Sequence, residues 1–390
     1  MADEKPLSKE TLAVHKGRMS REHFGVVNTP VYRASTILYR DLASVESGDA
    51  PYIYGRLGTP TSRSLEEAVT ALEVGARTVL CPSGTNAITT AILSVCSAGD
   101  HLLMTDNCYG PTRSFCEKSL TRLGVETSFY DPLIGGGIEE LFRSNTRAVF
   151  CESPGSLTFE VQDIPAIASV AHARDASVLL DNTWATPLYF DAFARGADLS
   201  IQAVTKYVGG HADVMLGYVT ANTTYAEQLA DTHSGLGLCA SGDDCFLALR
   251  GLRTMPVRLK RHEETGLKLA RWLESRSEVT RVLHPALESD PGHPIWKRDF
   301  TGASGLFGVE LAPVTKAALE AFFDGLECFG IGYSWGGYES LIVPAHFNRS
   351  VRPFLAQGPL LRIHAGLEDA NDLLADLENG FERMQTQTTA

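Results

Sequence analysis

The stretch Asp198–His211 constrains the fold of this chain more than any other part of the sequence. Its first half is apolar and β-branched between an acidic residue and a pair of glycines, which predicts a strand ending in Thr205 and Lys206. A lysine there can form a Schiff base with a carbonyl, because the pKa of lysine shifts readily when it is buried. Most lysines are solvated surface groups, so this feature alone is a weak signal.

A second predicted strand upstream strengthens the interpretation of Lys206 as a functional residue. The segment Ser177–Thr183 is another apolar run, and it places the carboxylate of Asp181 at its end. In an open parallel sheet the carboxyl ends of the strands meet along the crevice where ligands bind. An Asp that faces a pyridinium nitrogen and a Lys that forms a Schiff base are the protein groups that pyridoxal phosphate (PLP) requires. Asp181 and Lys206 together therefore point to a PLP site.

Several separated motifs then stand in the order found in one known family. The sequence resembles the Cys/Met-metabolism family of PLP enzymes, fold type I, over nearly its whole length. The motifs that carry this resemblance are Tyr54-Gly55-Arg56, Pro82-Ser83-Gly84-Thr85, Asp181-Asn182-Thr183, Ala203-Val204-Thr205-Lys206 and Leu361-Arg362-Ile363-His364. Within the family, Tyr333–Leu341 resembles the corresponding segment of the bacterial cystathionine β-lyase branch.

The resemblance implies an α/β protein with the PLP-dependent transferase fold type I. Strand and helix patterns alternate from Thr78 to Thr220, which independently predicts a mostly parallel sheet covered by helices. We expect an N-terminal arm (1–60) that contacts a neighbouring subunit, a PLP-binding domain (61–250) and a smaller α+β domain (251–390). Around the last boundary we expect two helices, 243–253 and 257–274. Gly135-Gly136-Gly137 lacks the context of a phosphate loop and predicts a flexible loop.

The cofactor contacts start at the turn after the 78–81 strand. Pro82-Ser83-Gly84-Thr85 leads from a strand into a helix, a geometry that suits a phosphate, although an ordinary strand-to-helix turn explains the same residues. The resemblance favours the phosphate. It also implies PLP contacts from five more residues on the same chain and from two on the neighbouring subunit. The residues so implied are Ser83, Gly84, Thr85, Tyr109 (stacked on the ring), Asp181, Thr183, Thr205 and Lys206 (the covalent attachment), with Tyr54 and Arg56 acting in trans.

Arg362 lies in the last apolar strand, where a charged residue is either paired structurally or directed at a ligand. A guanidinium is the best bidentate partner for an α-carboxylate, and the family uses this arginine for that purpose. The resemblance implies a carbon–sulfur lyase that splits L-cystathionine by β-elimination into homocysteine, pyruvate and ammonia, in methionine biosynthesis. Lys206 would take the Cα proton, Lys206 or Tyr109 would protonate the leaving sulfur, and Ser334, Trp335 and Arg362 would orient the substrate.

Three positions depart from the branches that act at Cγ. Ala203 replaces a serine three residues before the lysine, Ser156 replaces an asparagine, and Trp335 replaces a small aliphatic residue. A rigid indole beside the substrate would narrow the space for a lysine that moves on to Cβ, so these positions favour β-elimination. A γ-lyase, a γ-synthase or another cysteine-S-conjugate lyase stays open as an alternative. So does a non-catalytic regulator on the same fold, because fold does not fix function.

Composition narrows the class of partner. The net charge is −13 with 34 scattered basic residues, which argues against nucleic acid or an anionic membrane. No apolar run approaches a membrane span, the N-terminus has no signal-peptide core, and the eight cysteines show no metal-binding spacing. We therefore expect no metal and a cytoplasmic location, while the family resemblance implies a sulfur amino acid as substrate. The family implies a homotetramer built of dimers that share active sites.

Overall fold

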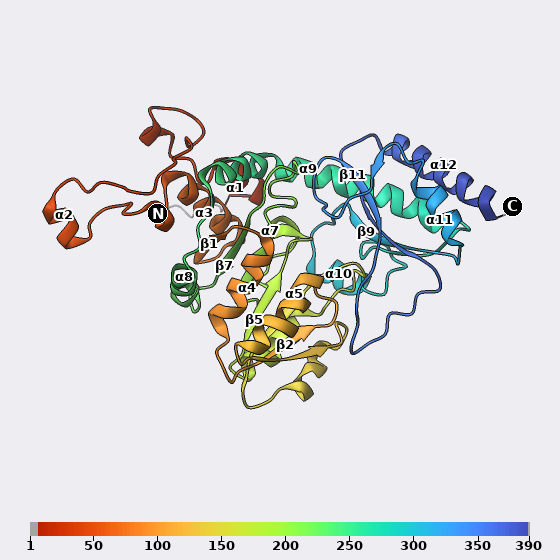
Figure 1. The fold of residues 1–390 in the computed structure, drawn as a ribbon, viewed down its shortest axis with the longest axis horizontal. Coiled ribbons are helices and arrows are strands. Elements are labelled where there is room, and N and C mark those ends of the chain that lie inside the picture. The colour runs from red at the N-terminus through yellow and green to blue at the C-terminus, as the bar shows by residue number, and fades with distance from the viewer. Residues whose placement is uncertain (1–6, 389–390) are drawn as a thin grey trace.

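The computed structural model describes residues 7–388 and contains two β-sheets (Figure 1). The larger sheet has seven strands in the order β1-β7-β6-β5-β4-β2-β3. Six of them, β1 to β6, run in the same direction, because β7, which lies between β1 and β6, is antiparallel to both. The strands are β1 (Arg77–Cys81), β2 (His101–Thr105), β3 (Glu126–Tyr130), β4 (Thr146–Glu152), β5 (Ser177–Asp181), β6 (Leu199–Gln202) and β7 (Gly217–Ala221). The mostly parallel sheet expected from the sequence is confirmed.

Helices cover this sheet on both faces. Successive residues of one strand enter two different cores: Val178 and Leu180 of β5 join one cluster, whereas Leu179 joins the other. Every residue of β5 is buried, which explains why its sequence is continuously apolar rather than alternating. The associated helices are α3 (Pro60–Glu73), α4 (Gly84–Val95), α5 (Gly110–Ser114), α6 (Ile164–Ala173), α7 (Thr186–Tyr189) and α8 (Ala226–Gly235).

The smaller sheet has five strands in the order β10-β11-β12-β9-β8. Its strands are β8 (Val279–Leu283), β9 (Leu306–Leu311), β10 (Phe329–Gly330), β11 (Ser340–Pro344) and β12 (Leu360–His364), with helices α10 (His293–Asp299), α11 (Lys316–Phe323) and α12 (Ala370–Thr388). A separate apolar cluster fills this part, formed by β9, β11, β12, α11 and α12. The α/β architecture with a smaller α+β unit is thus confirmed.

A single helix of 33 residues, α9 (Gly242–Glu274), connects the two parts. The expectation of two helices around Pro256 is wrong, because α9 continues through that proline. Proline lacks the amide N–H and costs one backbone hydrogen bond, but the buried side of α9, including Leu252, Met255 and Leu259, holds the helix in place by packing. Position 250 lies inside α9, and the division of the chain at that residue stays a prediction.

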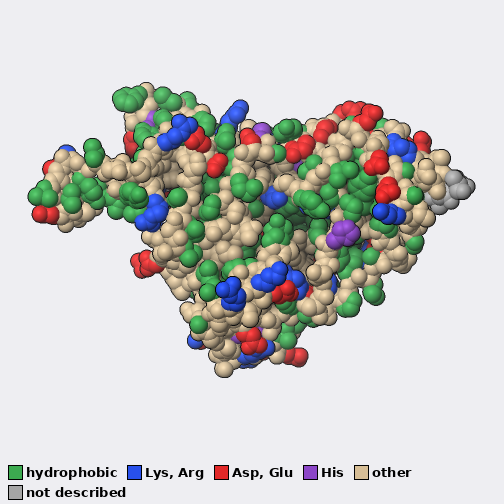
Figure 2. Space-filling view, viewed as in Figure 1, with side chains coloured by type: hydrophobic (Ala, Val, Ile, Leu, Met, Phe, Trp, Pro, Cys, Tyr) green, Lys and Arg blue, Asp and Glu red, His purple; other side chains and the backbone are tan. Residues whose placement is uncertain are grey.

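The N-terminal segment carries α1 (Lys9–His15) and α2 (Leu42–Ser47), and the part around α2 projects away from the rest of the molecule (Figure 1). Apolar side chains lie on the surface there (Figure 2). The most exposed are Phe24, Leu38 and Leu42.

Elsewhere, Gly135–Leu141 forms a 3-10 helix, so the expected flexible loop is wrong. Among residues 7–388, no helix has the length and apolarity that a membrane span requires.

Candidate active site

The candidate site forms at the carboxyl ends of β4, β5 and β6. Strand β6 ends at Gln202, so Lys206 lies four residues beyond the strand, in a turn, and not at the strand end that the sequence predicted. Ala203, the first residue of this turn, connects the parts of the site. Its N–H donates to Thr183 Oγ1 at 3.0 Å, and a Cβ added to Gly84 would lie only 2.6 Å from its Cβ.

Lys206 is held by the C-terminal part of the chain. Its Nζ donates to Ser334 Oγ at 3.0 Å and lies 5.0 Å from the centre of the Trp335 ring. Burial, reinforced by the positive charge of Arg362 and opposed by Asp181, lowers the pKa of Lys206 to about 8. At pH 7 about a tenth of the amine is therefore uncharged, far more than for an ordinary lysine, and the uncharged form is the one that acts as a nucleophile or a base.

Asp181 is buried and oriented by Thr183. Both the N–H and the hydroxyl of Thr183 donate to Oδ1 of Asp181, at 3.0 and 2.5 Å. These recorded bonds leave Oδ2 for another donor. Burial raises the pKa of Asp181, while the two bonds from Thr183 and the charge of Lys206 act in the opposite direction. The predicted placement of Asp181 and Thr183 beside Lys206 matches this arrangement.

The turn Ser83-Gly84-Thr85 begins α4. Ser83 caps the helix by accepting from the N–H of Asn86 at 3.1 Å, and Gly84 keeps the backbone close to Ala203. The first N–H groups of a helix have no partners within it and attract anions. The hydroxyl of Thr205 already donates to the carbonyl of Leu216 at 3.1 Å, so this side chain has a structural partner besides any ligand.

Arg362 and Tyr109 lie close enough together for each to influence the pKa of the other. The Nη2 of Arg362 donates to the carbonyls of Gly332 and Ser334, at 2.9 and 3.0 Å. Its Nε is buried and has no hydrogen-bond partner among the described residues. An arginine with one unsatisfied buried donor fits a carboxylate ligand. Tyr109 remains 44% exposed, which leaves a ring surface free to stack on a flat ligand.

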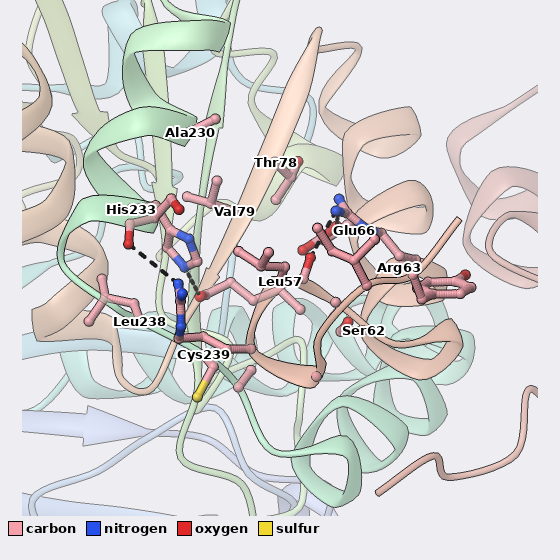
Figure 3. Close-up of a pocket in the computed structure, with 18 of the residues that line it drawn as sticks. Leu57, Ser62, Arg63, Glu66, Thr78, Val79, Ala230, His233, Leu238 and Cys239 are labelled. Carbon is pink, nitrogen blue, oxygen red and sulfur yellow. Dashed lines mark hydrogen bonds and ion pairs between the residues drawn. The ribbon is translucent and has the colours of Figure 1, made fainter. Parts of the chain in front are cut away.

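Tyr54 and Arg56 lie elsewhere in this chain. Arg56 Nη1 is 3.5 Å from the carbonyl of Ser234, at the end of α8. It lines a pocket of about 400 Å³ together with Arg63, His233 and others (Figure 3). None of the residues lining this pocket belongs to the group around Lys206. Within one copy of the chain, neither Tyr54 nor Arg56 has a hydrogen bond or ion pair to the other predicted residues among those described.

Sequence reasoning gave no role to Glu152, the last residue of β4. It lies beside Asp181 in the β4–β5 register, and its Oε2 accepts from the N–H of Tyr109 at 2.8 Å. Burial, with Asp181 adding to it, raises its pKa well above the usual value. Its position at a strand end, like that of Asp181, was the available signal.

These groups fit pyridoxal phosphate: a lysine with a lowered pKa, a buried carboxylate with a free oxygen, a helix N-terminus and an exposed aromatic ring. The model of the family described as "Cys/Met metabolism PLP-dependent enzyme" matches residues 10–382. The chain belongs to this family, and pyridoxal phosphate is its cofactor, bound to a lysine.

Individual relatives narrow the comparison. The chain is 51% identical to a "Putative cystathionine beta-lyase" of Rhizobium johnstonii, over 95% of each chain. It is 43% identical to "Cystathionine beta-lyase MetC" of Escherichia coli, over 98% of this chain and all of the other. Among solved structures, a cystathionine gamma synthase from Xanthomonas oryzae pv. oryzae, in complex with aminoacrylate and cysteine, matches with a TM-score of 0.89 and 30% identity, over 98% of this chain and 100% of that one.

Proposed function

We propose that this protein is a cystathionine β-lyase, a PLP-dependent carbon–sulfur lyase of methionine biosynthesis. It converts L-cystathionine and water into homocysteine, pyruvate and ammonia. The observation that carries the proposal is the group of Lys206, Ser334 and Trp335: an amine held on a serine hydroxyl, with an indole 5.0 Å away. Beta-lyase relatives that are 43% and 51% identical support it.

Each residue has a role in this reaction. Bound PLP supplies a conjugated ring that takes up the charge left when the Cα proton is removed. Lys206 would hold the cofactor, and its Nζ is the base that takes the Cα proton. Asp181, whose Oδ1 is taken by Thr183, would hold the ring nitrogen protonated through its remaining oxygen, and Tyr109 would stack on the ring. Either Lys206 or Tyr109 returns a proton to the sulfur as the carbon–sulfur bond breaks.

The remaining residues bind and orient. The N-terminus of α4, with Ser83, Gly84 and Thr85, binds the cofactor phosphate, aided by Thr205. Arg362 binds the substrate carboxylate through its unpaired Nε, while its Nη2 holds the Ser334 carbonyl. This second bond matters because it links the carboxylate site to the residue that holds Lys206. Substrate binding and the position of the base are thereby coupled.

Gamma-elimination is the nearest alternative reaction, because the chain is also similar in structure to a cystathionine gamma synthase. That reaction requires a further proton abstraction, at Cβ. Trp335 packs between two apolar clusters and against Tyr207, so its indole is fixed beside Lys206. A fixed indole limits the movement of the lysine beyond Cα, which favours β-elimination. The retained Lys206, Asp181 and Arg362 argue against a non-catalytic regulator.

We further propose a homotetramer built of dimers that share active sites. Two observations support sharing: Arg56 lies apart from Lys206 within one chain, and the projecting N-terminal segment exposes apolar side chains. A cytoplasmic location suits the free cysteines, six of which are buried.

The decisive experiment is product identification from L-cystathionine with the purified holoenzyme. Pyruvate and homocysteine in equal amounts are the expected products, with 2-oxobutyrate and cysteine minor. Lys206→Ala is the matched control, which should remain folded and produce neither pair. Dominant 2-oxobutyrate would overturn the β-assignment, and a wild-type protein without visible cofactor absorbance or turnover would overturn the enzyme assignment.

A further inference from the structure

Four aromatic side chains pack against one another next to Lys206. They join the part of the molecule with the seven-stranded sheet to the part with the five-stranded sheet. Tyr207 follows the lysine directly, and its ring lies 5.4 Å from Trp335, 5.3 Å from His262 and 5.9 Å from His364, centre to centre. The two imidazoles are 5.1 Å apart. His262 comes from α9 and His364 from the end of β12. We call these four residues the ring cluster.

Of the two histidines, only His364 contacts the turn Ser334–Gly337, which carries Ser334 and Trp335. Its Nε2 lies 3.1 Å from the N–H of Gly336 and 3.1 Å from the carbonyl of Gly337. His262 instead contacts the carbonyl of Ala365 through Nδ1, at 2.8 Å. The two buried histidines therefore differ in what they hold, although both pack on Tyr207.

The turn has little freedom to move. Gly336 has a φ of +85°, and a Cβ at this position would lie 2.9 Å from the carbonyl carbon of Lys206. Only glycine permits both the left-handed conformation and this approach. The backbone of the turn thus lies directly on the Lys206–Tyr207 backbone. The turn is thus held at two places, by the Lys206–Tyr207 backbone at Gly336 and by His364 at Gly336 and Gly337.

Both imidazoles are uncharged in this setting. Burial lowers the pKa of His364 well below the usual value, with His262, Arg362 and Lys206 acting in the same direction, and burial lowers that of His262 to about 4. An uncharged imidazole offers one donor and one acceptor. At Nε2 it binds either Gly336 or Gly337, and in both cases the bond fixes the turn.

We propose that His364 is a positioning residue: by holding Gly336 and Gly337 it keeps Ser334 at Lys206 and the Trp335 indole beside the substrate, and so favours β- over γ-elimination. The effect on product choice rests on the proposed function, whereas the effect on the turn does not. Arg362 lies two residues earlier on β12, on the same face of the strand. One strand therefore binds the substrate carboxylate and sets the position of the residues that hold the base.

The test compares three substitutions. His364→Gln places an amide near the position of Nε2 and should preserve the bond to the turn. His364→Asn is also polar but too short to reach it. His262→Asn removes a histidine of the same cluster that does not touch the turn, and so controls for altered packing. Circular dichroism and thermal unfolding establish that each variant is folded.

The first readout uses the cofactor-free protein and isolates Trp335 fluorescence by subtracting the Trp335→Phe partner of each variant. His364→Asn should shift the Trp335 emission to the red and raise its quenching by acrylamide, while His364→Gln and His262→Asn stay near wild type. If His364→Asn leaves Trp335 unchanged, or if His262→Asn changes it equally, the proposal is wrong. This readout does not depend on which reaction the enzyme catalyses.

The second readout uses the holoenzyme with L-cystathionine. His364→Asn should lower kcat about tenfold with a KM change of less than about twofold, and should raise the share of 2-oxobutyrate, because misplacing a catalytic group by 1 Å costs up to about a hundredfold. His364→Gln should restore both values. Should His364→Asn not fold, His364→Leu takes its place. Displacement of Trp335 and loss of turnover in a folded His364→Leu, with both preserved in His364→Gln, would support the proposal, and wild-type behaviour in His364→Leu would overturn it. A wild-type enzyme without β-lyase activity would refute the proposed function while leaving the fluorescence result valid.

Discussion

Glu152 and Asp181 lie side by side in the register of β4 and β5, yet their hydrogen bonds differ. Asp181 accepts two bonds from Thr183, whereas the recorded bonds of Glu152 include one from the N–H of Tyr109. Two adjacent buried carboxylates do not both ionise readily. The pKa of Glu152 is raised by burial and by Asp181, so we assign the single negative charge to Asp181.

This asymmetry predicts opposite outcomes for two matched substitutions. Asp181→Asn should lower kcat/KM about a hundredfold or more, because the cofactor ring nitrogen loses its charged partner. Glu152→Gln should stay within about threefold of wild type, because a neutral amide oxygen still accepts from Tyr109. Steady-state kinetics on cystathionine measure both. A severe loss in Glu152→Gln with a mild one in Asp181→Asn would reverse the charge assignment.

Lys206 predicts a pH dependence of cofactor uptake. With a pKa of about 8, the amine of the cofactor-free protein becomes uncharged as pH rises through that value. The rate of PLP attachment should rise about tenfold per unit below pH 8 and level off above it, as followed by stopped-flow visible absorbance. The same shift predicts that stability rises with pH. The lysine of the unfolded chain keeps its proton up to about pH 10.4, so the free energy of unfolding rises between about pH 8 and 10.4. A midpoint near 10.4 would mean that Lys206 is not desolvated.

Arg56 predicts complementation between subunits. Mixing inactive Lys206→Ala with inactive Arg56→Ala protein should restore activity at about a quarter of the sites, because half of randomly formed dimers are mixed and each holds one intact site. Mixing Lys206→Ala with the double variant Lys206→Ala/Arg56→Ala is the matched control and should stay inactive. Absence of recovery, after subunit exchange is demonstrated by mass-labelled chains, would count against shared sites.

Arg362→Lys should retain the cofactor absorbance and bind substrate poorly. One ammonium cannot replace both the bond to the Ser334 carbonyl and a bond to the carboxylate, so we expect a loss of about 2–3 kcal/mol in kcat/KM. The same measurement with an amine that lacks the carboxylate is the control and should change far less. An unchanged kcat/KM for cystathionine would show that another group binds the carboxylate.

The sequence predicted those parts of the fold that local pattern determines. The fully buried run of β5 gave a parallel strand with Asp181 at its end, and the strands on either side followed in the same way. The continuity of α9 through Pro256 was not predictable, because packing of residues such as Leu252 and Leu259 outweighs the cost of the proline. Local propensity carries no information about that packing.

The candidate site also contains residues that the sequence could predict and residues that it could not. Asp181 was predicted from its position at the end of β5 and Lys206 from its position after β6, whereas Thr183 was implied by the family resemblance. The role of Glu152 depends on register with Asp181, and that of His364 on a contact with Gly336, 28 residues away along the chain. No spacing rule connects such pairs. The location of Arg56 beside Ser234 also depends on how the N-terminal segment packs, and the sequence has no signal for it.

The indole of Trp335 predicts the choice between the two eliminations. It lies 5.0 Å from Lys206 Nζ and is fixed by contact with Tyr207 at 5.4 Å. Because β-elimination needs only the Cα proton, it tolerates a narrow site, whereas γ-elimination requires the lysine to reach Cβ as well. Trp335→Ala should therefore raise the ratio of 2-oxobutyrate to pyruvate about tenfold, at the lower end of the roughly 10–200-fold that small changes in a pocket produce. Trp335→Phe keeps a large ring and should stay closer to wild type. Chromatographic quantification of both keto acids decides the matter, and a ratio in Trp335→Ala equal to that of wild type would remove the indole from the control of reaction choice.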